Sequence, residues 1–159
     1  MGSGTRARVA ILLGWMLAGA GAHGAAQEAV DAGGSVASPD GRTRVTVDVD
    51  ENGAPRYAVS RDGRDLMPAA FLGLRFQSQP AFDDGFRVAA VSHSSHDERW
   101  EQPWGERRVM RDRHNELLVT FAAAKGAART FNLRVRVFDD GFGFRYEVPQ
   151  QPGYAGSIN

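Results

Sequence analysis

The sequence contains no cysteine among its 159 residues. A disulfide framework, a thiolate metal site and a cysteine nucleophile are therefore excluded, and so is lipid attachment to a cysteine at a signal cleavage point. The chain also has no excess of either charge, because 19 basic side chains balance 19 acidic ones. Without a basic excess there is no electrostatic footprint for nucleic acid, and we expect no nucleic-acid partner.

Long apolar runs are scarce, and the clearest one lies near the N-terminus, over residues 9–20. It follows Arg6 and Arg8 and precedes a series of small residues that reaches Ala26. A positive start, a short apolar stretch and small residues at the cleavage point are typical of a signal peptide. A membrane span needs about 20 apolar residues, so an uncleaved anchor helix is the less favoured alternative. We predict a signal peptide over residues 1–26 and a periplasmic or secreted mature chain without membrane contact.

A leader rich in alanine, glycine and serine follows, and we expect residues 27–37 to be disordered. Beyond it, apolar residues alternate with polar ones, which is the period of a half-buried strand. The strands predicted in this way cover residues 43–49, 56–61, 72–76, 86–91, 116–121, 131–137 and 142–148. Turn sequences such as Asn52-Gly53 and Asp62-Gly63 separate several of them. The pattern predicts an all-β fold, an antiparallel β-sandwich of about seven or eight short strands.

Residues 92–115 interrupt this alternation with a polar, charged stretch that contains Trp100 and Trp104. A loop of this length within a compact domain is usually functional, or it contains a short strand that the pattern does not show. Val109 and Met110 are the residues that such a strand would contain. We therefore expect a long loop here and search it for candidate site residues.

Acids and arginines are interleaved along this stretch. Glycoside hydrolysis uses two carboxylates at a defined separation, but the sequence singles out no pair among these acids. The arginines favour a solvated ion-pair network instead. His93, His96 and Asp97, with His114 as a third histidine, are candidate metal ligands. A His-x-x-His spacing outside a helix has no fixed geometry, so we interpret these residues as surface histidines.

The two tryptophans of this stretch are the best candidates for contact with a ligand. A flat indole ring stacks on the apolar face of a sugar ring while its N–H keeps a hydrogen-bond partner. The alternative is that Trp100 and Trp104 anchor the loop by packing against the sheet. We favour the anchor interpretation, because an all-β domain with few aromatic residues often uses tryptophan in this way.

Three groups of residues, in order along the chain, resemble the N-terminal domain of glycoside hydrolase family 97. They are Ser-Pro-Asp-Gly (38–41) with Tyr-Ala-Val-Ser (57–60), Trp-Glu-Gln-Pro-Trp-Gly-Glu (100–106) with Arg-Asp-Arg-His-Asn-Glu-Leu (111–117), and Arg-Val-Arg-Val-Phe-Asp-Asp-Gly-Phe-Gly-Phe-Arg-Tyr (134–146). Their order and spacing are specific, and they span nearly the whole mature chain, to about Gln150. His114 lies where the family more often has an aromatic residue.

The resemblance implies part of a β-super-sandwich similar to that of galactose mutarotases, here over residues 38–159 and incomplete at its C-terminus. In this family the domain precedes a (β/α)₈ barrel that carries the catalytic carboxylates. The enzymes hydrolyse α-glucosides or α-galactosides, with inversion in some members and retention in others. Calcium is implied near the active site of the full-length enzyme, and no cofactor is expected in this chain. The implied partners are an α-linked oligosaccharide and a catalytic barrel domain.

No catalytic residue of the family can be assigned to a position of this sequence, so we predict that the chain alone is inactive. The candidates for contact with carbohydrate or with the barrel are Trp100, Trp104, Glu106, Arg111, Asn115 and Glu116. We favour a fragment of a hydrolase that lacks the barrel, and the alternative is a free-standing secreted carbohydrate-binding module. A standalone mutarotase-like enzyme is the least favoured, because it rests on an analogy of fold and would need His93, His96 or His114.

Overall fold

The computed structural model describes residues 33–154, and every regular element within this range is a β-strand. The strands are β1 (Gly34–Ala37), β2 (Thr43–Val49), β3 (Pro55–Arg61), β4 (Arg64–Phe71), β5 (Phe86–Glu101), β6 (Val109–Ala123), β7 (Thr130–Val137) and β8 (Phe142–Glu147). The described range holds no helix with the length and apolarity to cross a membrane. The predicted signal peptide and most of the predicted leader lie outside the described residues.

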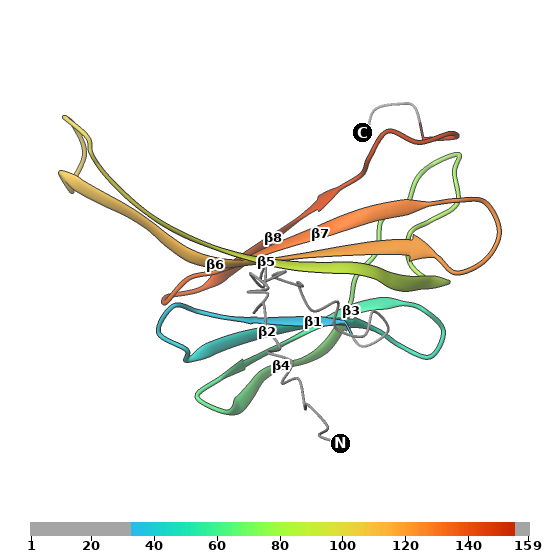
Figure 1. Ribbon diagram of the computed structural model, residues 1–159, viewed down its shortest axis with the longest axis horizontal. Coiled ribbons are helices and arrows are strands. Elements are labelled where there is room, and N and C mark those ends of the chain that lie inside the picture. The colour runs from blue at the N-terminus through green and yellow to red at the C-terminus, as the bar shows by residue number, and fades with distance from the viewer. Residues whose placement is uncertain (1–32, 155–159) are drawn as a thin grey trace, which may run out of the picture.

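The strands form two antiparallel sheets of four strands each, with the orders β1-β2-β3-β4 and β5-β6-β7-β8. In both sheets consecutive strands are neighbours, as short hairpin turns allow. Figure 1 shows the sheets stacked face to face, with the first sheet below the second. The prediction of an all-β, antiparallel β-sandwich is confirmed.

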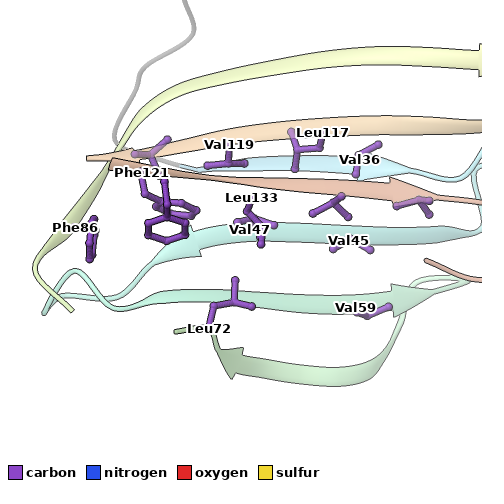
Figure 2. Packing of buried hydrophobic residues seen from close by; sticks show 14 of the residues in the cluster. Val36, Val45, Val47, Val59, Leu72, Phe86, Leu117, Val119, Phe121 and Leu133 are labelled. Atoms are coloured by element: carbon purple, nitrogen blue, oxygen red, sulfur yellow. The ribbon is translucent and has the colours of Figure 1, made fainter. Parts of the chain in front are cut away.

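The core lies between the sheets and consists of side chains that alternate along the strands. Val45 and Val47 of β2 face Leu133 of β7 across this layer (Figure 2). These three residues and Val135 of β7 are essentially inaccessible to water. At one end, four phenylalanine rings pack with centroids between 4.8 and 5.6 Å apart. Those rings belong to Phe82, Phe86, Phe121 and Phe131. Burial of this apolar surface is the main force that holds the sheets together.

Two glycines show how closely the chain packs. Gly53 has a φ of 74°, and a Cβ there would lie 2.5 Å from the carbonyl oxygen of Phe86, so the predicted Asn-Gly turn admits only glycine. Gly34 has an ordinary φ, but its Cβ would lie 2.8 Å from Val91 and 3.0 Å from Leu117 of the second sheet. The glycine at 34 therefore lets the edge of one sheet approach the other.

Two predicted boundaries were wrong. The segment expected to be a disordered leader contains β1, which pairs with β2 in the register Gly34↔Val47. Its small residues are suited to close packing between sheets, a property that composition alone does not distinguish from disorder. The third strand was expected over residues 72–76, but β4 ends at Phe71. β4 is an exposed edge strand, so it lacks the alternation that a buried face imposes.

The expected loop over residues 92–115 is instead a long hairpin. β5 and β6 remain paired from Phe86↔Ala123 to Glu101↔Val109, far past the rest of the sandwich. Figure 1 shows this hairpin leaving the sandwich and bending away from the first sheet. Neither of its faces packs on a second layer there, so neither face carries a regular alternation of apolar residues. The period of two therefore vanishes from the sequence although the strands continue.

Candidate functional site

The candidate site residues lie on or beside the projecting part of the hairpin, which we call the hairpin arm and define as residues 96–114. Its boundary is set by β7, whose pairing with β6 ends at Asn115↔Val137. Beyond that point β5 and β6 have only each other as strand neighbours. A two-stranded ribbon of this kind gains little from packing, so its side-chain pairs and its surroundings decide whether it is stable.

The arm has two faces, because paired residues of antiparallel strands point to the same side. One face continues the outer face of the second sheet, the side that points away from the first sheet. Its pairs are His96↔His114, Glu98↔Asp112 and Trp100↔Met110. The other face continues the side that covers the core. Its pairs are Asp97↔Arg113, Arg99↔Arg111 and Glu101↔Val109.

The outer face is crossed by a chain of ion pairs that starts at Glu116, whose exposed fraction is only 8%. Glu116 accepts from Arg134 and from Arg136 Nε, the latter at 2.8 Å. Arg134 also donates from Nε to Glu147 Oε1 at 2.7 Å, and Arg145 donates from Nε to the same oxygen at 2.9 Å. We call these five residues of β6, β7 and β8 the arginine–glutamate ladder.

The pKa values within the ladder follow from these contacts. Burial raises the pKa of the Glu116 carboxyl, but hydrogen bonds from Arg136 and Arg134 outweigh that effect and leave it below its ordinary value. The hydrogen bond from Arg134 also lowers the pKa of Glu147, and Glu147 in turn raises the pKa of Arg134. Both carboxyls are therefore held as carboxylates and are unsuited to donate a proton near neutral pH.

His114 lies beside the ladder and is not the surface histidine that we predicted, since its exposed fraction is 3%. Its Nδ1 lies 2.5 Å from Asp112 Oδ1. Its ring packs between Phe138, with centroids 5.0 Å apart, and His96, with centroids 5.2 Å apart. His96, Asp112 and His114 border a hollow of about 220 Å³ on the outer face, which Ser94, Ser95, Glu116 and Arg136 also line.

Two of the predicted site residues lie on the opposite face and hold the hairpin in place. Asn115 donates from Nδ2 to the carbonyl oxygen of Ala37 at 2.9 Å and so joins β6 to the end of β1. Arg111 forms a two-point contact with Asp97, at 2.7 and 2.6 Å. The hydrogen bond from Arg111 lowers the pKa of Asp97. The predicted ion-pair network is present here, on a paired ribbon instead of a loop.

The tip of the arm carries Trp104 and Glu106, both exposed. The exposed fraction is 80% for Trp104 and 44% for Trp100, so neither indole anchors a loop against the sheet, and the favoured interpretation was wrong. A hollow of about 540 Å³ lies beside Trp104 and is lined by Glu101, Gln102, Pro103, Gly105 and Arg108. Both tryptophans are therefore available for contact with a partner.

The six predicted residues thus fall into three places: Trp104 and Glu106 at the tip, Trp100 and Glu116 on the outer face, and Arg111 and Asn115 on the inner one. Sequence reasoning missed the partners of Glu116. The signal for them was the alternation in residues 131–137, because the arginines between the apolar residues must share one polar face.

Within residues 33–154 no three histidines or carboxylates are grouped to hold a metal ion. The carboxylates of the ladder and Asp97 are bound by arginines. These carboxylates are therefore already occupied by arginines and are unsuited to hold the calcium ion that the resemblance implies for the full-length enzyme.

Two stacked antiparallel sheets with a polar hairpin arm define a β-sandwich domain. The chain belongs to the glycosyl-hydrolase 97 N-terminal family, whose model matches residues 36–158. It is 31% identical over 152 residues to a "Probable retaining alpha-galactosidase" of Streptomyces bingchenggensis (strain BCW-1), covering 93% of this chain and 23% of that protein. The resemblance stated from the sequence is confirmed.

Solved structures agree with this family. A Glycoside Hydrolase Family 97 enzyme from Pseudoalteromonas sp. strain K8, in complexes with panose and with acarbose, is 38% identical with a TM-score of 0.71. The match covers 76% of this chain and 18% of that enzyme. A beta-arabinopyranosidase, 24% identical with a TM-score of 0.66, shares the fold. This chain spans less than a quarter of the length of the relatives that it matches.

Proposed function

We propose that this chain is the non-catalytic N-terminal domain of an α-glycoside hydrolase, and that it acts beside a catalytic barrel domain and contacts its α-linked oligosaccharide. Membership of the family and the small share of each relative that the chain covers support this proposal. The domain's role is then to present a surface to the barrel and the sugar, while the chemistry of bond cleavage takes place on the barrel.

The observation that carries the proposal is the exposure of Trp104 and Trp100 on an arm that leaves the sandwich. Tryptophan is enriched at interfaces, where its large apolar ring gains most from being covered. A projecting two-stranded ribbon also gains stability when a second surface packs against it. The arm is thus suited to contact both the catalytic barrel domain and the oligosaccharide bound there.

The charges support a non-catalytic role. Glycosidases need one carboxylic acid that remains protonated near neutral pH, and burial away from cations achieves this. Among residues 33–154 the shifts point the other way, since the pKa values of Asp97, Glu116 and Glu147 all lie below their ordinary values. Hydrogen bonds from arginine side chains lower all three pKa values. These carboxylates stabilise the sheet instead of transferring a proton.

The test is hydrolysis of aryl α-glucosides and aryl α-galactosides by the purified chain. We expect no release of chromophore above a blank without protein. A measurable rate that survives repurification would contradict the proposal, and its loss on replacing Glu116 or Asp112 would locate the activity on the outer face.

A free-standing carbohydrate-binding module is the second candidate. It is favoured by the core of residues 33–154, in which the four packed phenylalanines and the valines of both sheets are already buried. A monodisperse monomer with a sharp cooperative melt would support this alternative. A downstream reading frame that encodes a barrel would support the first.

We also propose that the chain is exported, with cleavage that leaves a mature N-terminus between Ala25 and Gln27. The support is the signal-peptide pattern of residues 1–26, which lie outside the described residues. N-terminal sequencing of the protein from the periplasm or medium tests this. Recovery of an intact Met1 end in the cytoplasm would contradict it.

A further inference from the structure

The hollow of about 220 Å³ on the outer face of the second sheet is lined by the buried His114 and by six other polar side chains. His114 Nδ1 lies 2.5 Å from Asp112 Oδ1, a contact in which the ring N–H donates to the carboxyl oxygen. The His114 side chain is only 4% exposed, and its Nε2 makes no hydrogen bond among the described residues. Every fully buried side-chain nitrogen or oxygen in residues 33–154 has a partner, so Nε2 is an accessible atom at the wall of the hollow.

Donors complete the hollow. Arg136 uses Nε to bind Glu116, and among the described residues its two terminal nitrogens make no hydrogen bond. The Ser94 hydroxyl lies 3.5 Å from Glu116 Oε1, and His96 Nε2 lies 3.4 Å from Glu98 Oε2 and 4.0 Å from Asp112 Oδ2. The hollow therefore contains hydrogen-bond acceptors, the carboxylates of Asp112 and Glu116, beside groups that can donate, on Arg136, Ser94 and His96.

The balance of charge in the hollow indicates the class of ligand. The negative charges of Asp112 and Glu116 are balanced by the positive charges of Arg136 and of Arg134 in the ladder. The hollow therefore has no excess of either charge that would attract an anion or a cation. A hydroxyl group both donates and accepts, and neighbouring hydroxyls of a sugar present these functions side by side. The hollow therefore matches a neutral polyol better than a phosphate or a metal ion.

An apolar platform lies on the same face. Trp100 follows His96 by four residues along β5, a distance of about 14 Å at the rise of an extended strand. Its indole is 44% exposed and pairs across the hairpin with Met110. Figure 1 shows the hairpin bending toward the side of this outer face, so the platform and the hollow border one concave surface.

We propose that this surface is a sugar-binding subsite for a neutral α-linked oligosaccharide. One sugar ring places its hydroxyls against His114 Nε2, Asp112 and Arg136, and a further ring stacks on Trp100. The inference rests on the proposed function in taking an α-linked sugar as the ligand. It goes further by assigning the contact to the outer face and not to the tip.

The experiment is a titration of the full chain with panose, followed by calorimetry and by tryptophan fluorescence. Trp100→Ala removes the platform and Asp112→Asn alters the hollow. Trp104→Ala tests the tip, because it removes the more exposed indole there, and Val109→Ala is the matched control, because it truncates an exposed apolar side chain on the opposite face of the arm. We expect Trp100→Ala and Asp112→Asn each to weaken panose binding about tenfold, and Val109→Ala to leave it unchanged. Trp100→Ala keeps the test valid if Asp112→Asn fails to fold, since Trp100 is outside the core.

Three results would overturn the proposal: unchanged affinity in both Trp100→Ala and Asp112→Asn, an equal loss in Val109→Ala, or no binding of panose by the wild-type chain. None of these decides whether the domain serves a hydrolase, which the hydrolysis assay and the downstream reading frame test separately. Binding that is lost only in Trp104→Ala would move the sugar contact to the tip and leave the proposed function intact.

Discussion

Glu116 of β6 and Arg136 of β7 lie directly opposite each other in adjacent antiparallel strands, and Arg136 Nε donates to Glu116 Oε2 at 2.8 Å. Arg134 donates to the other oxygen of the same carboxylate. One nearly buried carboxylate therefore bridges two guanidinium groups, and removal of its charge would leave both without their shared anionic partner. Charge-assisted bonds of this type are stronger than neutral ones.

Glu116→Gln is expected to lower the free energy of unfolding by about 1.5–3 kcal/mol, the range for hydrogen bonds to charged groups. The control is Glu98→Gln, because the Glu98 side chain is 64% exposed and should contribute less than about 0.5 kcal/mol. Urea denaturation followed by circular dichroism measures both. Equal midpoints for the two variants would show that the ladder does not stabilise the sheet.

The ladder also predicts loss of stability in acid. The folded-state pKa values of Glu116 and Glu147 lie below their ordinary value of 4.5, so the unfolded chain takes up protons first as the pH falls. Their contribution is complete above that value and disappears as the pH falls through the folded pKa values. We expect Tm to drop below about pH 4.5, and to drop less steeply in Glu116→Gln. Parallel slopes for the two proteins would contradict this.

Phe131 lies at the centre of the phenylalanine cluster, in contact with Phe82, Phe86 and Phe121. Phe131→Ala is expected to destabilise the chain by about 3–5 kcal/mol, because it leaves a cavity between the sheets. Phe71→Ala serves as the control, since Phe71 is 69% exposed and should change stability by less than about 0.5 kcal/mol. Denaturant midpoints at a constant m-value test the difference.

After removal of the predicted signal peptide, Trp100 and Trp104 are the two tryptophans of the chain. Both are exposed, so the native protein should show the emission of water-exposed indole and efficient quenching by acrylamide. Trp104→Ala should change the unfolding free energy by less than about 0.5 kcal/mol. Blue-shifted, poorly quenched emission from a monomer would restore the anchor interpretation.

β8 forms an edge of the second sheet, and Phe144 on it is 40% exposed. Unpaired edges with apolar side chains recruit other chains, so we expect the mature chain to self-associate. Gly143→Glu places a charge on this edge, where a Cβ meets nothing within 4 Å and Arg136 lies opposite. Light scattering after size exclusion should show a lower mass for this variant. A monodisperse wild-type monomer would contradict the prediction.

The alternation of apolar residues was sufficient to predict β2, β3, β7 and β8, their antiparallel arrangement and the sandwich. This prediction succeeds because a strand with one face in the core must place an apolar side chain at every second residue, whichever strands it pairs with. The Asp62-Gly63 turn was equally predictable, since Asp62 and Gly63 adopt φ values of 52° and 75° that few other pairs tolerate. Three ordered motifs were also enough to identify the family.

The hairpin arm and the location of the candidate residues were decided by tertiary structure. Residues 96–114 extend past the first sheet, so burial leaves no trace in their sequence, and pairing with a neighbour strand keeps them extended. A shift of one residue in the register of these strands would have moved every side chain of the arm to the opposite face. The register of β5 and β6 therefore decides whether Trp100 lies on the same face as Glu116 or on the same face as Asn115. That register is set by the core residues at the far end of the same two strands.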